Sequence, residues 1–180
     1  MVNKIWNVGL FQKSLSSLFL VISVASFTVL SGCLDSASGH TFEEQLEKDL
    51  AAIDQYLADN GITALSDPNN FIRYVVHEEG GGSKPTIENC VTTSYFGELF
   101  DGSSFDESDQ ASFPLDGVIL GWQIGIPLLQ KGDSATLYIP SGFAYGSQSL
   151  PGIPVNSNLI FNIRLKDIGA DYDPTTRSCF

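Results

Sequence analysis

The chain has 180 residues, of which 9 are lysine or arginine and 21 are aspartate or glutamate, so its formal charge at neutral pH is -12. This acidity argues against a nucleic-acid partner, because the phosphate backbone would repel the protein. We interpret it as a source of solubility, because no group of acids has the spacing of a metal-binding loop. The two histidines, His40 and His77, lack metal-ligand spacing with Cys90 or Cys179, and the sequence therefore predicts no metal site.

The first 32 residues have the layout of a secretory signal peptide. Two lysines and no acid occur before Cys33, and an apolar stretch covers residues 15–30. The closing sequence Leu30-Ser31-Gly32-Cys33 resembles the lipobox of bacterial lipoproteins, which implies cleavage before Cys33 and its acylation. The alternative is a membrane-spanning anchor, but the apolar stretch is short for a span and is interrupted by serines. We expect residues 33–40 to form a lipidated tether to a membrane.

Residues 41–65 are predicted to contain an N-terminal helix. Thr41 and Glu44 fit a capping box at its start, and Asn60-Gly61 is a stop signal. Apolar residues recur at spacings of three or four and form one stripe, which consists of Phe42, Leu46, Leu50, Ile53 and Leu57. The stripe could dock on the main domain or pair with a second copy of the chain. We favour docking, because the helix is short for a coiled coil.

The next segments have the patterns of β-strands. Residues 71–77 are rich in β-branched and aromatic residues and precede a glycine-rich turn. Residues 90–99 form a second predicted strand, and Asp101-Gly102 is a tight-turn signal that leads into residues 103–106. These two segments are therefore predicted to form a hairpin.

The second half of the domain is predicted to contain a short helix and two further strands. Residues 121–129 have the apolar content of a helix, although Gly125 and Pro127 weaken that prediction. Residues 135–139 form a strand that ends at Pro140, and a glycine- and proline-rich loop follows. From Leu159 onward, apolar residues alternate with polar ones, which is typical of a strand with one buried face.

These elements predict an α+β fold in which an antiparallel twisted sheet of about five strands wraps around one short helix. We place the main domain at residues 66–170 and a C-terminal tail at residues 171–180. With Cys33 assigned to lipid, Cys90 and Cys179 can form one disulfide, in a compartment that permits it. Two free thiols are the alternative, and the sequence does not decide between them because it does not show whether the Cα atoms lie close together.

Several motifs occur in a fixed order between Phe71 and Ile168, and the set resembles the active-site constellation of FKBP-type peptidyl-prolyl isomerases. The matching segments are Tyr95-Phe96-Gly97, Asp101-Gly102, Phe105-Asp106, Val118-Ile119-Leu120-Gly121-Trp122, Ala144-Tyr145-Gly146, Ile153-Pro154 and Leu159-Ile160-Phe161. The resemblance implies the FKBP-like fold and an isomerase that acts on Xaa-Pro bonds without a cofactor. The chain departs from the family pattern at Phe96, which replaces a small polar residue, and at Ala111, where some members have an aromatic residue.

The resemblance also implies roles for individual residues. Trp122 would form the floor of an aromatic pocket, and Phe113 would pack behind it. The Ile119 amide and the Tyr145 hydroxyl would donate hydrogen bonds to substrate carbonyls, and Asp106 would polarise the site beside Tyr95. The other expected substrate-binding residues are Phe105, Val118, Ile153 and Phe161.

The expected partners are proline-containing segments of exported proteins, and the membrane through lipidated Cys33. The expected location is the bacterial cell envelope. Leu34 follows Cys33 in place of the aspartate that is associated with inner-membrane retention, which favours the outer membrane. Two alternatives remain: a non-catalytic chaperone or adaptor that uses the same pocket as a peptide-binding groove, and a structural lipoprotein whose isomerase-like fold is a relic. The joint presence of Trp122, Asp106 and Tyr145 favours catalysis.

Overall fold

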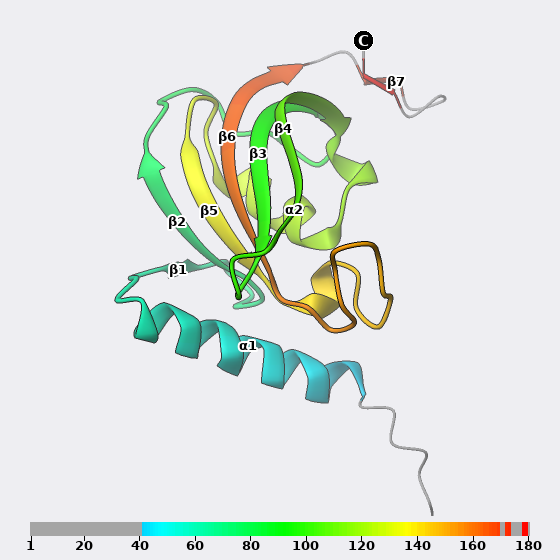
Figure 1. The fold of residues 1–180 in the computed structure, drawn as a ribbon. Coiled ribbons are helices and arrows are strands. Elements are labelled where there is room, and N and C mark those ends of the chain that lie inside the picture. Colours follow the sequence, from blue (N-terminus) through cyan, green and yellow to red (C-terminus); the bar gives the residue numbers. More distant parts are fainter. Residues whose placement is uncertain (1–40, 170–171, 174–177, 180) are drawn as a thin grey trace, which may run out of the picture. The chain divides into compact units, whose positions relative to one another are not determined.

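The computed structural model describes residues 41–169, 172–173 and 178–179 (Figure 1). All described residues belong to one compact unit of the chain. The predicted signal peptide, the predicted lipidation site Cys33 with its tether, and most of the C-terminal tail lie outside the described residues. In the described part of the chain, no helix has both the length and the apolar character needed to cross a bilayer.

The N-terminal helix α1 spans Phe42–Asp59 and begins at the predicted capping box. The Glu44 amide donates to Thr41 Oγ1, and the Thr41 amide donates to Glu44 Oε2, each over 3.2 Å. Asn60 caps the carboxyl end, and Gly61 follows with a φ of +64°, a conformation that glycine adopts without strain. Local sequence signals are therefore sufficient to set both ends of this helix.

The main sheet has six strands in the order β1-β2-β5-β6-β3-β4, and every neighbouring pair is antiparallel. This confirms the predicted α+β fold with its antiparallel sheet. Four strand predictions match closely, but β1 was not predicted, and β4 continues well beyond Asp106. The strands are β1 (Leu65–Ser66), β2 (Arg73–Glu78), β3 (Cys90–Leu99), β4 (Ser104–Pro114), β5 (Ser134–Ile139) and β6 (Leu159–Gly169); a separate pair comprises β7 (Tyr172–Asp173) and β8 (Ser178–Cys179).

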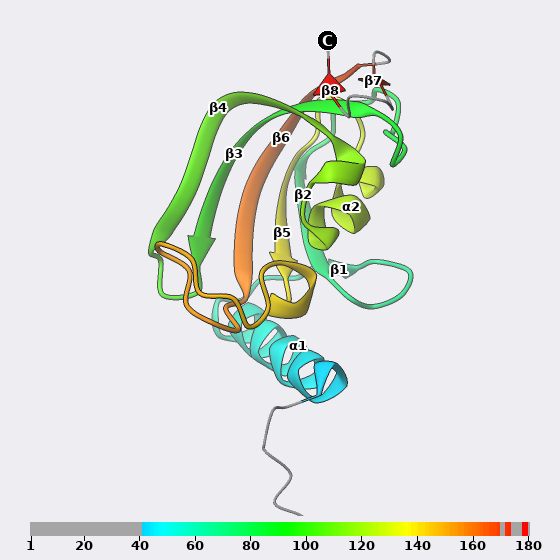
Figure 2. The ribbon, with the colours of Figure 1, turned by 90° about the vertical axis from the view of Figure 1, so that its right-hand side faces the viewer.

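The short helix α2 spans Leu120–Gly125 and lies against the concave side of the curved sheet (Figure 2). The sequence predicted a longer helix, but from Ile126 to Leu128 the chain forms a 3-10 turn that contains Pro127. Gly121 brings the helix close to the sheet, because a Cβ atom there would lie 2.3 Å from Ile139 Cγ2. The main core fills the space between α2 and the inward-facing residues of β5 and β6, which include Leu137, Ile139, Leu159 and Phe161.

Helix α1 packs on the opposite face of the sheet. Tyr138 and Ile160 alternate with core residues along their strands, so they point away from α2 and meet Ile53 and Leu57 of α1. Ile53 is fully buried and Leu57 is 6% exposed. The stripe on α1 is therefore docked on the domain of its own chain, which is the arrangement that the sequence analysis favoured.

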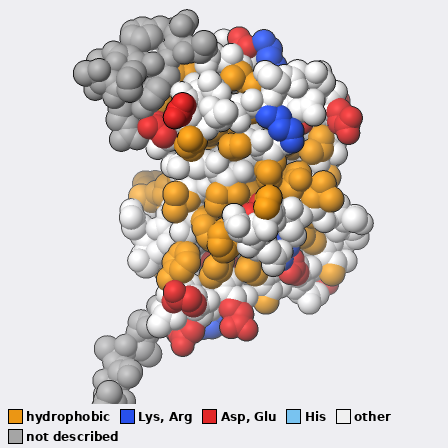
Figure 3. Space-filling model, turned by 180° about the vertical axis from the view of Figure 1, so that it is seen from behind, with side chains coloured by type: hydrophobic (Ala, Val, Ile, Leu, Met, Phe, Trp, Pro, Cys, Tyr) orange, Lys and Arg blue, Asp and Glu red, His pale blue; other side chains and the backbone are white. Residues whose placement is uncertain are grey.

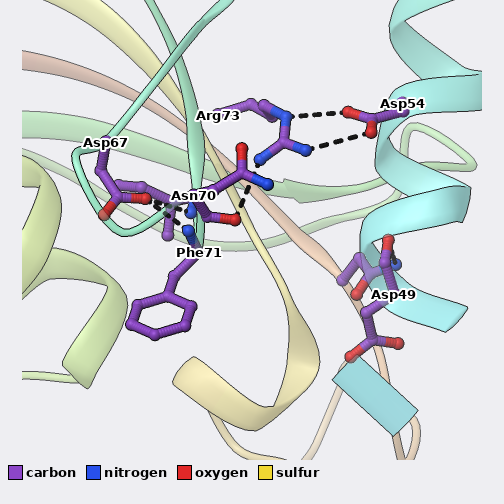
Figure 4. Close-up of polar contacts among 8 residues, drawn as sticks. Asp49, Asp54, Asp67, Asn70, Phe71 and Arg73 are labelled. Carbon is purple, nitrogen blue, oxygen red and sulfur yellow. Dashed lines mark hydrogen bonds and ion pairs between the residues drawn. The ribbon is translucent and has the colours of Figure 1, made fainter. Parts of the chain in front are cut away.

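Two aspartates, the exposed Asp54 of α1 and the buried Asp67, hold the segment around β2 in place (Figure 4). Asp54 of α1 forms a bidentate ion pair with Arg73 of β2, with N–O distances of 2.8 and 3.0 Å. Asp67, which is 3% exposed, accepts hydrogen bonds from the amides of Asn69, Phe71 and Ile72 over 2.6–2.8 Å. The second arrangement closes the loop between β1 and β2 and fixes the start of the segment that carries Phe71.

The structure joins Cys90 and Cys179 in a disulfide, with their Cα atoms 5.8 Å apart. Cys90 is the first residue of β3, and it pairs with Gly169 at the end of β6 in the sheet. The bond therefore links the last described residues of the chain to the strand that carries Tyr95.

Candidate active site

A cavity of about 310 Å³ lies between the sheet and α2. Hydrophobic side chains gather on this side of the molecule, and acidic side chains lie at its lower end (Figure 3). A larger hollow of about 580 Å³ lies on the outer face of the sheet, but Trp122 and Phe161 are not among its residues. We assign the functional site to the smaller cavity, because the predicted residues converge there. It is lined by Tyr95, Asp106, Phe113, Gly117, Val118, Ile119, Trp122, Tyr145 and Phe161.

Trp122 is the centre of an aromatic cluster that forms the apolar part of this cavity. Its ring meets those of Tyr95, Phe113 and Phe161 edge to face, at centroid distances of 5.3, 5.7 and 5.2 Å. The Trp122 side chain is 4% exposed, so its position is set by packing. Edge-to-face rings hold one another in place, and the cavity therefore has a rigid apolar floor before any ligand arrives.

Three further residues were predicted for this site, and the structure places each of them. Phe113 lines the cavity, although it was expected to pack behind it. Phe105 and Ile153, which were expected in the wall, do not line it. The ring of Phe105 lies over Gly97, where a Cβ atom would be 2.7 Å away, and it meets Phe161 at 5.4 Å. Ile153 is 6% exposed and belongs to the main core.

The polar side of the cavity is built around Asp106. The Tyr95 hydroxyl donates to Asp106 Oδ2 over 2.8 Å, across the antiparallel pair β3 and β4. Burial, followed by this hydrogen bond, raises the pKa of Tyr95 to about 12. Burial and then the charge of Asp106 also raise the pKa of Tyr145. Both tyrosines therefore keep their protons at neutral pH, and Tyr145, which lines the cavity, has a hydroxyl that can donate a hydrogen bond.

The backbone at the start of α2 is held by a residue that sequence reasoning missed. The Gln123 side-chain amide donates to the Val118 carbonyl over 2.8 Å. That carbonyl belongs to the same peptide group as the Ile119 N–H, which was predicted to bind substrate. The Ile119 carbonyl in turn accepts hydrogen bonds from the Trp122 and Gln123 amides. The orientation of the Ile119 N–H is thus fixed by a side chain one turn further along the helix.

Tyrosine titration provides a test of the contact between Tyr95 and Asp106. The pKa of Tyr95 is raised from 10.0 to about 12, so folding favours the protonated hydroxyl. Its contribution to stability is complete below pH 10 and is lost as the pH rises through about 12. We expect Asp106→Asn to lower the pKa of Tyr95, as measured by the absorbance of tyrosinate, with Tyr95→Phe identifying the transition. An unchanged transition in Asp106→Asn would contradict the contact.

Comparison with known proteins points to one family. A family model described as FKBP-type peptidyl-prolyl cis-trans isomerase matches residues 81–166. The FKBP-type peptidyl-prolyl cis-trans isomerase FkpA of Escherichia coli K12 is 43% identical over 99 residues, which cover 53% of this chain and 37% of the relative. A probable FkpA of Neisseria meningitidis serogroup B is 37% identical over 129 residues, which cover 69% of this chain and 46% of the relative. The chain thus spans less than half of the length of these two relatives.

A solved structure is similar over most of its own length. The peptidyl-prolyl cis-trans isomerase of Pseudomonas syringae pv. tomato superposes with a TM-score of 0.60 at 30% sequence identity. The match covers 68% of this chain and 94% of the solved chain. The likeness therefore extends well beyond the residues of the cavity.

Proposed function

The chain belongs to the FKBP-type peptidyl-prolyl cis-trans isomerase family, and from this premise we propose that it accelerates the isomerisation of Xaa-Pro bonds in exported proteins. The observation that carries the proposal is the convergence of Tyr95, Asp106 and Tyr145 on one cavity with Trp122 and Phe161. These five residues come from five separate segments of the sequence, namely β3, β4, α2, the loop after β5 and β6. Ordinary core packing would not require the Asp106 carboxylate and the tyrosine hydroxyls to lie beside the aromatic rings.

The chemistry needs no nucleophile and no cofactor. Rotation about an Xaa-Pro bond has a barrier of about 20 kcal/mol, because the twisted amide loses its resonance. A site lowers this barrier when it binds the twisted amide more tightly than either planar isomer. We propose that the aromatic floor around Trp122 holds the proline ring away from water.

The polar groups of the cavity would then bind the peptide on either side of the Xaa-Pro bond while that bond rotates. The Tyr145 hydroxyl and the Ile119 N–H would donate hydrogen bonds to carbonyl groups of the peptide and hold its two ends, so that twisting occurs at the bond between them. The Asp106 carboxylate, oriented by Tyr95, would stabilise the altered charge distribution of the twisted amide. Because these groups are already fixed in place, little reorganisation is required during the reaction.

The non-catalytic alternative has less support than the isomerase. A chaperone or adaptor would need a partner surface besides the cavity, and the apolar stripe of α1 is a candidate for it. Ile53 and Leu57 of that stripe are buried against the sheet. The cavity remains as a peptide-binding groove, which a kinetic measurement can distinguish from an enzyme.

We also propose that the protein is exported and attached to a bacterial membrane through lipidated Cys33. The support comes from the sequence of residues 1–33, with its two lysines, its apolar stretch and its final Leu-Ser-Gly-Cys. Leu34 after the cysteine favours the outer membrane. The proposed substrates, proline-containing segments of translocated proteins, follow from this location.

The proposal is tested by cis-trans exchange of an Xaa-Pro peptide. We expect the protein to accelerate exchange, and Asp106→Asn to lower kcat/KM about tenfold, which corresponds to about 1.4 kcal/mol of lost transition-state stabilisation. Asp109→Asn is the matched control, because Asp109 lies on the same strand but outside the cavity; it should leave the rate unchanged. Peptide binding without acceleration would instead support the adaptor.

A further inference from the structure

A buried carboxylate of α1 reaches the loop that carries Tyr145. Asp49 Oδ2 accepts two hydrogen bonds from Ser141, one from its amide over 2.9 Å and one from its hydroxyl over 2.6 Å. Asp49 is 3% exposed and Ser141 is fully buried. The two residues are 92 positions apart in the sequence. The contact therefore joins the N-terminal helix directly to the short 3-10 turn Ser141–Phe143 that follows β5.

Ser141 in turn holds the backbone on both sides of Tyr145. Its carbonyl accepts hydrogen bonds from the amides of Ala144 and Gly146, over 2.9 and 2.8 Å. Gly146 has a φ of +55°, so the chain turns sharply after Tyr145 at a position that suits glycine. The amide and hydroxyl of Ser141 are thus fixed by Asp49, and the carbonyl of Ser141 in turn fixes the two residues that flank Tyr145.

Further contacts hold Asp49 and the turn in this arrangement. The Gln45 side chain donates to Asp49 Oδ1 over 2.7 Å, and Asn158 Oδ1 accepts a second hydrogen bond from the Ser141 amide over 3.1 Å. The ring of Phe42 at the start of α1 meets Phe143 edge to face at 5.9 Å. The α1 helix therefore contacts the turn by polar and by aromatic groups. Figure 4 shows Asp49 on the same helix as Asp54, whose partner is Arg73.

We propose that Asp49 is a positioning residue for Tyr145, so that α1 forms part of the working isomerase site. The proposal rests on the function proposed above for the cavity. Hydrogen bonds to an ionised carboxylate are stronger and shorter than neutral ones, which suits a contact that must fix a loop. The family match begins at residue 81, so Asp49 lies outside the segment that the family model describes. The placement of Tyr145 thus depends on a residue of α1, which precedes that segment in the sequence.

A double-mutant cycle on the full chain tests the proposal. Asp49→Ala should lower kcat/KM for an Xaa-Pro peptide about fivefold or more, and by less than about twofold in a protein that already carries Tyr145→Phe. This non-additivity is expected because Asp49 acts through the Tyr145 hydroxyl. A merely structural role would produce the same relative loss in both backgrounds, and that result would overturn the proposal.

Two variants control for folding. Asp49→Asn keeps a side-chain oxygen for both Ser141 donors, so it should restore most of the activity lost in Asp49→Ala. Asp54→Ala removes the ion pair with Arg73 from the same helix, but it leaves the Ser141 contacts intact. Its kcat/KM should therefore stay within about twofold of the parent value. Equal losses in Asp54→Ala and Asp49→Ala would mean that docking of α1 alone is responsible, and would also overturn the proposal.

Hydrogen exchange provides a readout that does not depend on catalysis. The amides of Ala144 and Gly146 should exchange about tenfold faster or more in Asp49→Ala, and at the parent rate in Asp54→Ala. Unchanged exchange of these two amides in Asp49→Ala would overturn the positioning role. If the parent protein does not accelerate isomerisation, the proposed function fails, while the exchange rates still decide whether Asp49 positions the Tyr145 segment.

Discussion

Replacing Trp122 with alanine is expected to lower the free energy of unfolding by about 3–5 kcal/mol and to abolish isomerase activity. The side chain is 4% exposed and meets three aromatic rings, so its removal leaves a large cavity beneath the binding site. Tyr95 and Phe161 would also lose the ring that holds them in place. Urea denaturation followed by circular dichroism measures the stability, because Trp122 is the only tryptophan among the described residues and its fluorescence would be lost in this variant.

Trp122→Phe is the informative comparison. It keeps an aromatic ring in the cluster, and it removes an indole N–H that has no hydrogen-bond partner within the described part of the chain. A buried donor without a partner costs about 1–3 kcal/mol, so its removal offsets part of the lost packing. We expect a clearly smaller loss of stability than in Trp122→Ala. Equal losses in the two variants would show that the ring contacts contribute little.

Asp67→Ala is expected to lower the free energy of unfolding by about 3 kcal/mol, although Asp67 lies outside the cavity. Its carboxylate accepts three backbone amides, and that of Ile72, a fully buried residue, would be left without its acceptor. The change also releases Phe71, whose ring stacks on Phe143 at 5.0 Å. Thermal and urea denaturation measure the loss.

The hairpin between β3 and β4 offers a matched control for this effect. Asp101 Oδ1 accepts the Ser103 amide over 2.9 Å, which is the same kind of contact in an exposed turn. Water can replace the carboxylate there, so Asp101→Ala should cost much less than Asp67→Ala. A similar loss of stability in both variants would mean that burial of the backbone amides that donate to Asp67 is unimportant.

Features with a local cause could be predicted from the sequence. The ends of α1 follow from a capping box and an Asn-Gly stop, and both ends of β3 were placed correctly. The identity of most cavity residues followed from the motif resemblance. The two-residue strand β1 was missed because so short a segment shows no periodicity.

Features that depend on distant partners could not be predicted. The packing of the Phe105 ring was not predicted, because the sequence does not show that Gly97 leaves room for it. Asp49 was not singled out in the sequence, because its partner Ser141 lies 92 residues away. Gln123 likewise acts through the backbone of Val118. Polar residues that hydrogen-bond to the backbone around a site, without lining it, leave no pattern in the local sequence.

The strand order has a consequence for how the chain folds. β6 is the last strand of the main sheet in sequence, yet it lies in the middle, between β5 and β3. Before Leu159–Gly169 has been made, the remaining strands can form two separate groups, β1-β2-β5 and β3-β4, with no strand to join them. Tyr95 and Asp106 belong to the second group, and the buried face of β5 to the first. The cavity can therefore close only after the carboxyl-terminal part of the chain is available, and contacts of such long range slow folding.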